Sequence, residues 1–408
     1  MIMCKKAKHL LLSLLAGTLI TTLASCNKEN DDQIQSYPLT ISFSPSDELA
    51  SAEISNVKVI VSGAAGNDTI AMTSLQPTTI TKVQGQYKIT VTGKVTNEAA
   101  AYVNGTGAVD LYAPQNISIN LAKRLESPLL FKTLYTTAGA QYYMLDGYFE
   151  IVNNSDEVQY LDQLVLSAPT GNAKQANAWQ ASGITDLYES GQGSVLAFPG
   201  SGKDYPIQPG EFVVIANEAM NHTLAYGEDI SKREEYAKSP NLINADWEIY
   251  LNTGDADNPD VPNLEVIFSN NKYMKAFGLG VMGRSYILAK LPEGITPKAF
   301  AATETNIQTV PGSSSSMTYL MIPSKYVLDA VDLYNPNTDA ADHYPTFLAK
   351  DDATGVHCSG SYQGKCVRRK VSKIVNGRVY YQDTNNSNAD FKNNQDNTPR
   401  FVPTSVDE

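Results

Sequence analysis

Two cysteines near the C-terminal end are the leading candidates for covalent chemistry in the folded part of the chain. Cys358 and Cys366 stand eight positions apart, and the segment between them contains two glycines that let it turn back on itself. This spacing favours a disulfide across a small loop, as in many exported proteins. Zinc is the weaker alternative, because only His357 lies beside the two thiols and such a site is one ligand short.

A short acidic run offers oxygen ligands for a hard cation. Asp255, Asp257 and Asp260 lie within six consecutive residues. Calcium prefers carboxylate and carbonyl oxygens, although the run lacks the glycine and the distal glutamate of an EF-hand loop. An acidic turn without metal is the alternative interpretation. Calcium is the one cofactor that the sequence suggests.

Catalytic signatures are absent from the sequence. Gly278, Gly280 and Gly283 form a G-x-G-x-x-G pattern, but residues 284–288 after it alternate like a strand. A dinucleotide site needs a helix at that place, so these glycines are expected to allow tight backbone packing instead. No H-E-x-x-H, G-x-S-x-G or C-x-x-C motif occurs. We therefore expect a protein that is not an enzyme.

Trp179 is the candidate ligand contact among the aromatic residues. It lies in residues 171–203, a stretch rich in Gly, Ser, Ala and Asn that is expected to be a long inserted loop. An indole in such a loop either folds back as an apolar plug or is displayed for a ligand. Desolvation of the indole favours the plug.

The N-terminal residues have the pattern of an export signal. Three lysines in residues 5–8 precede an apolar run over residues 10–23, and two small residues then stand directly before Cys26. The apolar run is too short and too interrupted to span a membrane. The pattern resembles the bacterial lipobox, which implies cleavage after residue 25 and a membrane anchor of acyl chains on Cys26.

The composition of the mature chain restricts its partners. Removal of residues 1–25 leaves 28 Lys and Arg against 43 Asp and Glu, a formal charge of −15. This charge argues against binding to nucleic acid or to anionic lipid surfaces. Residues 26–36 are polar and are expected to form a flexible tether. Residues 28–32 resemble the acidic signal that takes Bacteroidota lipoproteins to the outer cell face, which implies an exposed position on the outer membrane.

Period-two alternation of apolar residues predicts an all-β fold with two β-sandwich domains. Residues 37–124 are expected to form a small sandwich that resembles transthyretin-like or carboxypeptidase-regulatory modules. Residues 125–405 are expected to form a larger β-sandwich with inserted loops. Helices should be few and short, and residues 217–226 and 230–238 are the best candidates for them.

Five segments of the second domain resemble the lamin-tail domain, which has an immunoglobulin-like fold. They are residues 146–162, 209–216, 326–334, 366–370 and 383–391. The resemblance implies structural rather than catalytic roles, with Asp390 accepting backbone donors beneath the aromatic ring of Phe391. The whole chain resembles a Bacteroidota lipoprotein family of unknown function, DUF4876.

Together these features predict a non-enzymatic surface lipoprotein that acts as a ligand-binding or accessory subunit. The kind of lipoprotein that the chain resembles implies an outer-membrane β-barrel uptake receptor as partner. One alternative is an adhesin or structural surface protein that binds glycans or host matrix. Another is a secreted hydrolase with a carboxylate site that has no sequence signature. The sequence does not define the oligomeric state.

Overall fold

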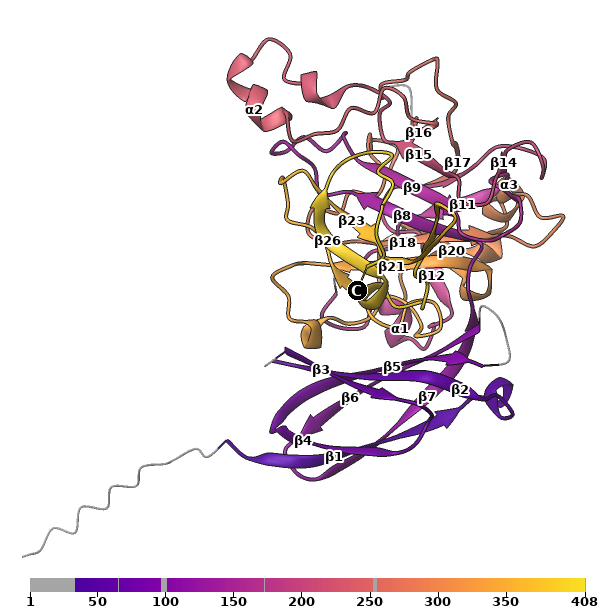
Figure 1. The fold of residues 1–408 in the computed structure, drawn as a ribbon. Helices are drawn as coiled ribbons and strands as arrows, with labels where there is room; N and C mark the ends of the chain where they lie inside the picture. Colours follow the sequence, from indigo (N-terminus) through magenta and orange to yellow (C-terminus); the bar gives the residue numbers. More distant parts are fainter. Residues whose placement is uncertain (1–33, 65, 97–100, 172, 252–254, 408) are drawn as a thin grey trace, which may run out of the picture. The chain divides into compact units, whose positions relative to one another are not determined.

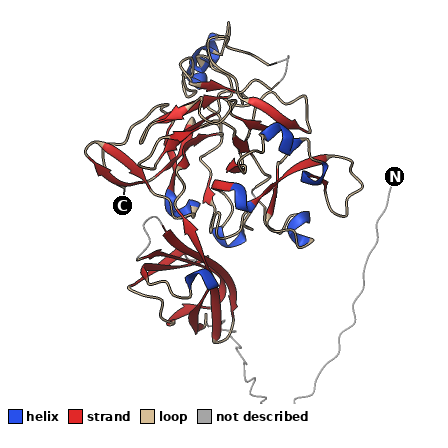
Figure 2. Cartoon of the chain, turned by 90° about the vertical axis from the view of Figure 1, so that its right-hand side faces the viewer, coloured by secondary structure: helices blue, strands red, loops and turns tan. Residues whose placement is uncertain are grey.

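The computed structural model describes residues 34–64, 66–96, 101–171, 173–251 and 255–407. Strands make up 43% of the structure and helices 10%, and the strands dominate the view in Figure 2. The predicted all-β class is therefore confirmed. The signal segment and Cys26, the predicted lipidation site, lie outside the described residues.

The first part of the fold is a seven-stranded sheet that encloses its own core (Figure 1). Leu39, Val59, Ile89 and Ile119 are completely buried in this core. Because successive side chains of a strand point to opposite faces, the alternation in the sequence fills one face of the sheet with apolar residues. In spatial order the strands are β3 (Gly66–Met72), β2 (Ile54–Gly63), β5 (Gly85–Val95), β6 (Ala101–Leu111), β7 (Gln115–Leu125), β1 (Ser36–Pro45) and β4 (Thr78–Val83).

The second part is a sandwich of two six-stranded sheets around one shared core. Phe131 and Ile151 from one sheet and Leu166, Leu288 and Val331 from the other belong to this core, as expected for sheets packed face to face. The first sheet has the order β16 (Trp247–Glu248), β15 (Phe212–Ala216), β9 (Tyr148–Asn153), β8 (Leu129–Tyr135), β23 (Lys365–Arg369) and β26 (Phe391–Asp396). The second sheet has the order β17 (Glu265–Ser269), β13 (Ser194–Ala197), β11 (Leu164–Ser167), β18 (Ser285–Lys290), β21 (Val327–Tyr334) and β22 (Val356–His357).

Smaller elements surround this sandwich. The short strands are β12 (Leu187–Glu189), β20 (Thr318–Pro323) and β19 (Ile307–Thr309) in one sheet, β10 (Gln159–Tyr160) with β14 (Pro206–Ile207), and β24 (Val371–Val375) with β25 (Arg378–Tyr381). The α-helices are α1 (Ala178–Ala181), α2 (Arg233–Tyr236), α3 (Pro297–Ala301) and α4 (Ser387–Asp390). The 3-10 helices are η1 (Asp47–Leu49), η2 (His222–Leu224), η3 (Ile230–Lys232), η4 (Glu304–Asn306), η5 (Ser324–Tyr326) and η6 (Ala340–Asp342).

One prediction about local structure needs correction. Residues 171–203 are not one long loop, because they contain α1, β12 and β13. Asn177 caps α1 by accepting the backbone N–H of Gln180, and Gln180 accepts that of Asn177 in return, which stabilises even a single helical turn. The helical candidates do contain short helical elements: η2 lies in residues 217–226, and η3 and α2 lie in residues 230–238.

The predicted boundary between residues 124 and 125 lies at the end of β7. Residues 36–408 nevertheless form one compact unit. Polar contacts cross the predicted boundary: Arg124 Nη2 donates to the carbonyl oxygen of Val327 at 2.9 Å, and Asn104 Nδ2 donates to that of Asn385 at 3.2 Å. The division into domains of residues 37–124 and 125–405 stays a prediction.

Candidate functional site

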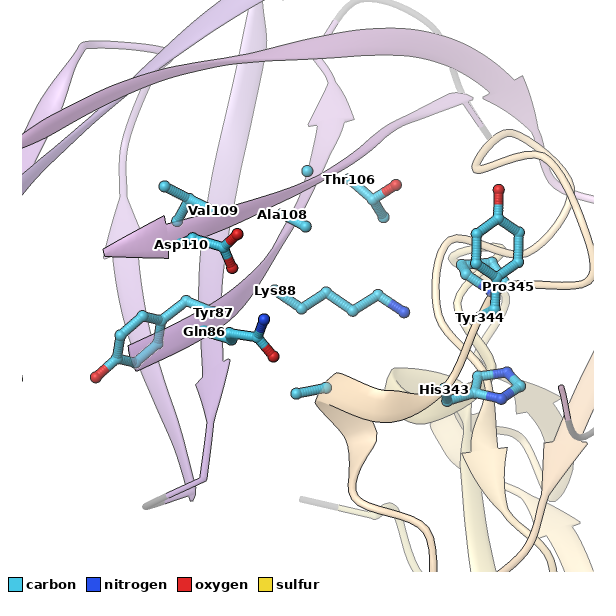
Figure 3. A pocket seen from close by; sticks show the side chains of 12 residues that line it. Gln86, Tyr87, Lys88, Thr106, Ala108, Val109, Asp110, His343, Tyr344 and Pro345 are labelled. Carbon is cyan, nitrogen blue, oxygen red and sulfur yellow. The ribbon is translucent and has the colours of Figure 1, made fainter. Parts of the chain in front are cut away.

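The candidate site is a cavity of about 380 Å³. Strands β5 and β6 provide one wall, and η6 with the segment that follows it provides the other (Figure 3). This volume lies near the lower end of the roughly 300–1,000 Å³ that is typical of small-molecule sites. The lining residues are Gln86, Tyr87, Lys88, Thr106, Gly107, Ala108, Val109, Asp110, Ala341, His343, Tyr344 and Pro345.

Lys88 is the cation of this cavity. It extends from β5 toward the segment that carries His343 and Tyr344 (Figure 3). Among the described residues its ammonium group has no hydrogen bond or ion pair. Burial lowers the pKa of Lys88, while the more distant carboxylates of Asp332 and Asp352 oppose this shift. The site therefore contains a half-buried positive charge, and the carboxylates of Asp332 and Asp352 stabilise it only at long range.

One ring nitrogen of His343 has no hydrogen-bond partner among the described residues. Its Nε2 lies 2.9 Å from Asp332 Oδ2, while the buried Nδ1 has no hydrogen-bond partner. The imidazole stacks on the ring of Tyr334 with a centroid distance of 4.2 Å and an interplanar angle of 12°. Because an ionised carboxylate can only accept, Nε2 donates to Asp332, and Nδ1 of the neutral ring is an acceptor.

A network of donors holds Asp332 in place. Burial opposes the ionisation of this carboxyl group, but His343, Thr346 and Ser285 favour it, so the pKa of Asp332 is lowered overall. Thr346 donates its backbone N–H to Asp332 Oδ2 at 2.9 Å, and Ser285 Oγ donates to Oδ1 at 2.9 Å. Asp352 accepts the backbone N–H of Asp332 at 2.9 Å. These contacts fix both the carboxylate and the orientation of the imidazole.

A second, smaller cavity of about 140 Å³ shares Lys88 and His343 with the first. Its wall is more polar and contributes hydroxyl, amide and imidazole groups. The other lining residues are Ile60, Ser62, Asn67, Thr90, Tyr334, Ala340, Thr354, Gly355, His357 and Asn388. Lys88 and His343 therefore line both spaces.

The predicted disulfide between Cys358 and Cys366 is wrong, because both thiols are free and buried. Cys358 packs in the shared core of the sandwich, whereas Cys366 packs in a separate cluster with Tyr135 and Tyr148. Burial raises the pKa of Cys358 to about 12 and that of Cys366 to about 11. The two side chains pack as small apolar groups in different hydrophobic clusters.

The three predicted calcium ligands do not converge. Asp255 Oδ2 accepts the backbone N–H of Leu251, Asp257 Oδ1 accepts from the Asn263 side chain, and Asp260 is exposed. Among the described residues, which exclude 252–254, no group of three or more His, Cys, Asp or Glu side chains is placed to hold a metal ion. The carboxylates of Asp255 and Asp257 are used for hydrogen bonds with nearby residues of the chain.

The remaining sequence candidates have structural roles. Trp179 is 6% exposed, and its ring lies edge-on against that of Tyr319 with a centroid distance of 5.1 Å. The indole is therefore folded back as an apolar plug and is not displayed for a ligand. The glycine pattern at 278–283 is followed by β18 and no helix. A Cβ atom on Gly280 would lie 2.6 Å from the Tyr286 hydroxyl, in agreement with the predicted packing role.

Sequence analysis did not identify Lys88 or His343. Lys88 stands on the outward face of an alternating strand, where a lysine is ordinarily solvated. His343 was one of only three histidines after the signal segment and belonged to no motif. One available signal was Asp332, a carboxylate within the apolar strand β21, because a buried carboxylate requires donors nearby.

An all-β protein with a polar cavity beside a β-sandwich is the class that these observations define. Residues 208–398 match the model of DUF4876, described as a protein of unknown function. The matched region contains Asp332 and His343, but Lys88 lies outside it. The resemblance to the lamin-tail domain remains a prediction.

The fold is similar to the crystal structure of a DUF4876 family protein from Bacteroides thetaiotaomicron. The two chains are 24% identical, the alignment covers 87% of this chain and 94% of that one, and the TM-score is 0.56. The fimbrial anchor protein Mfa2 from Porphyromonas gingivalis matches with 13% identity, 33% and 60% coverage, and a TM-score of 0.19. A comparison with curated proteins gave no match. Within the described residues, no helix has the length and hydrophobicity needed to cross a membrane.

Proposed function

We propose that this protein is a lipid-anchored, surface-exposed outer-membrane protein that binds a small molecule in the Lys88–His343 cavity. The observation that carries this proposal is the half-buried ammonium group of Lys88 in the wall of a cavity. Among the described residues, the Lys88 ammonium group has no hydrogen-bonding partner, and a ligand in the cavity would supply one.

A buried polar group without a hydrogen-bonding partner is unfavourable. A buried polar atom without a partner costs about 1–3 kcal/mol. The network around Asp332 keeps the imidazole fixed rather than letting it rotate toward a protein donor. The Lys88 ammonium group is the polar group that orients a ligand, while Val109 and Pro345 supply apolar contact.

The proposed lipid anchor and outer-membrane location are based on the sequence. The lipobox-like segment implies acylation of Cys26, and the negative charge of the mature chain suits an exposed, soluble surface.

We further propose that the bound molecule is passed to an outer-membrane uptake receptor, with this chain as the accessory subunit. Mild detergent purification and mass spectrometry test this partnership: a stoichiometric β-barrel supports it, and the protein arriving alone argues against it.

Ligand binding is tested by NMR screening of a chemically diverse small-molecule library. We expect binders of the wild-type protein that lose binding to Lys88→Met. Lys94→Met is the matched control, because Lys94 lies on the same strand, is exposed and does not line the cavity. Loss of the same binders in both variants, or in neither, would argue against the cavity as the site.

A further inference from the structure

We infer that Asn104 and Arg124 are positioning residues of the cavity: they hold its two walls together without lining it, and this inference rests on the proposed function. Both residues lie on the seven-stranded sheet, Asn104 on β6 and Arg124 on β7. Both bond to residues beyond the predicted boundary, and neither is among the residues that line the two cavities. We call this pair of side chains the clasp.

Asn104 provides the buried half of the clasp. Its side chain is completely buried, and Nδ2 donates to the carbonyl oxygens of Thr384 and Asn385, the latter at 3.2 Å. An amide nitrogen carries two hydrogens in one plane, so two successive carbonyl acceptors fix both the position and the orientation of the group. Loss of this donor would leave two carbonyl groups without it in a buried contact, which is unfavourable.

Arg124 provides the second half of the clasp at the end of β7. Its Nε donates to Asn385 Oδ1 at 3.2 Å, and its Nη2 donates to the carbonyl oxygen of Val327 at 2.9 Å. Its Nη1 lies 3.6 Å from Oδ1 of the buried Asp351. A planar guanidinium that reaches three residues at once restricts rotation more than a single flexible contact does.

On one side, the clasp is continuous with the strand wall of the cavity. Asn104 stands two positions before the cavity residue Thr106 on β6, so both side chains point to the same face of the sheet. Lys88 on β5 lies opposite Ala108, the next residue on this face. The strand pairing of β5 and β6 therefore connects the clasp to the Lys88 ammonium group.

On the other side, hydrogen bonds connect the clasp to the wall that contains His343. The loop that accepts from Asn104 continues to Ser387, which donates its backbone N–H to Asp352 Oδ1 at 2.8 Å and its hydroxyl to Oδ2 at 2.7 Å. Asp352 also accepts the backbone N–H of Asp332, and Asp332 holds the imidazole of His343. The clasp therefore closes a continuous set of contacts between the two walls.

The width of the cavity should depend on this clasp. Residues 126–128 are the covalent link between β7 and β8. Without the clasp, we expect the seven-stranded sheet to pivot about this link and the cavity to adopt a range of widths. If only about a tenth of the molecules then have the binding-competent width, the apparent affinity falls about tenfold.

The test is the distance between two nitroxide labels on the full-length protein, measured by double electron–electron resonance. The labels are attached at Thr81→Cys on β4 and Glu293→Cys after β18, two exposed positions outside the clasp and the cavity. The two cysteines near the C-terminal end are buried and do not compete for the label. We expect a narrow distribution of distances in the otherwise wild-type chain and a broad one in the double variant Asn104→Leu, Arg124→Met.

Three further variants complete the test. Asn120→Leu on β7 is the matched control, because Asn120 is exposed and lies outside the clasp. Arg124→Lys keeps a cation beside Asp351, so it should retain a narrow distribution. Thermal melting verifies that each variant is folded. If the double variant is unfolded, Asn104→Leu and Arg124→Met are measured singly.

The strongest Lys88-dependent binder from the library screen provides the second measurement. Its affinity should fall about tenfold in the double variant and stay unchanged in Asn120→Leu. An unchanged distance distribution in the folded variant would overturn the inference, as would a broad distribution with unchanged affinity. If no binder of the wild-type protein depends on Lys88, the proposed function is wrong, while the distance measurement still decides whether the clasp holds the walls together.

Discussion

Replacement of Arg369 by methionine is expected to destabilise the fold by about 3–5 kcal/mol, the usual effect of removing one partner from a buried ion pair. The Arg369 side chain is 1% exposed, and its Nη2 lies 2.5 Å from Asp329 Oδ2. Its Nη1 lies 3.7 Å from Asp383 and 3.8 Å from Asp390. Methionine retains much of the apolar volume but leaves three buried carboxyl groups without this guanidinium.

The size of this loss should depend on pH. Burial, followed by the charge of Asp383, raises the pKa of Asp329 and of Asp390 to about 6, and Arg369 opposes the rise. Their ordinary pKa is 3.8, so the folded state holds more protons than the unfolded state between these values. These two groups therefore favour folding below about pH 4, and that contribution is lost as the pH rises through 6. Without Arg369 both pKa values rise further, so the destabilisation grows from pH 5 to pH 8.

The assay is urea denaturation at pH 5 and pH 8, followed by tryptophan fluorescence. Trp247 reports on the affected core, since it is buried in the same sandwich. Lys365→Met is the matched control on β23, because the Lys365–Asp396 pair is 39% and 82% exposed and its loss should change the stability little. A loss below about 1 kcal/mol for Arg369→Met, or an equal loss at both pH values, would refute the reasoning.

Three further predictions concern other buried groups. Cys358 and Cys366 should both be reduced and should react with a thiol reagent only after unfolding, as measured by absorbance and intact mass. Burial, followed by the charges of nearby Asp255 and Glu248, raises the pKa of Glu218 to about 7. Stability should therefore fall as the pH rises from 4.5 to 7, and Glu218→Gln should be more stable relative to wild type at pH 8 than at pH 5, in urea titrations. Gly280→Ala should lower the free energy of unfolding by about 1–3 kcal/mol, because its methyl group meets the Tyr286 hydroxyl.

Each of these predictions has a contradicting outcome. A mass two daltons below that of the reduced chain would mean that the cysteines are paired. An unchanged pH profile for Glu218→Gln would show that this carboxyl titrates normally, with exposed Glu157→Gln as the control. For the glycine, Gly360→Ala is the control, because the nearest atoms to a Cβ there belong to the flexible Gln363 side chain. Equal stability of both alanine variants would exclude overpacking at Gly280.

The strands and some details of the scaffold could be predicted because their signals are local. Alternation around Val59 and Ile89 reflects one buried face of each strand, and both residues are fully buried. The predicted role of Asp390 is confirmed: it accepts the backbone N–H groups of Thr384 at 2.8 Å and Asn386 at 3.2 Å, next to buried Phe391. A carboxylate that accepts hydrogen bonds from donors within six residues can be predicted from the sequence, because the interaction is local.

The cysteine prediction failed for a geometric reason. Eight residues allow Cys358 and Cys366 to approach, but a disulfide also requires the two Cβ atoms to point toward each other. Cys358 follows β22 in one sheet of the sandwich, and Cys366 belongs to β23 in the other sheet. Their side chains enter separate clusters, and nothing in the spacing of the sequence shows which cluster a residue will enter.

The two halves of the candidate site differ in how far the sequence could reveal them. Asp332 and His343 are eleven residues apart, and a carboxylate inside the apolar strand β21 already demands a donor nearby. Lys88 is 255 residues before His343, on a strand whose alternation alone predicts a solvated side chain. Only the packing of the segment after η6 against β5 and β6 makes Lys88 part of a cavity. The fixed imidazole is therefore a property of the region that matches DUF4876, while the cation is supplied by a sheet outside that region. Both residues line the cavity.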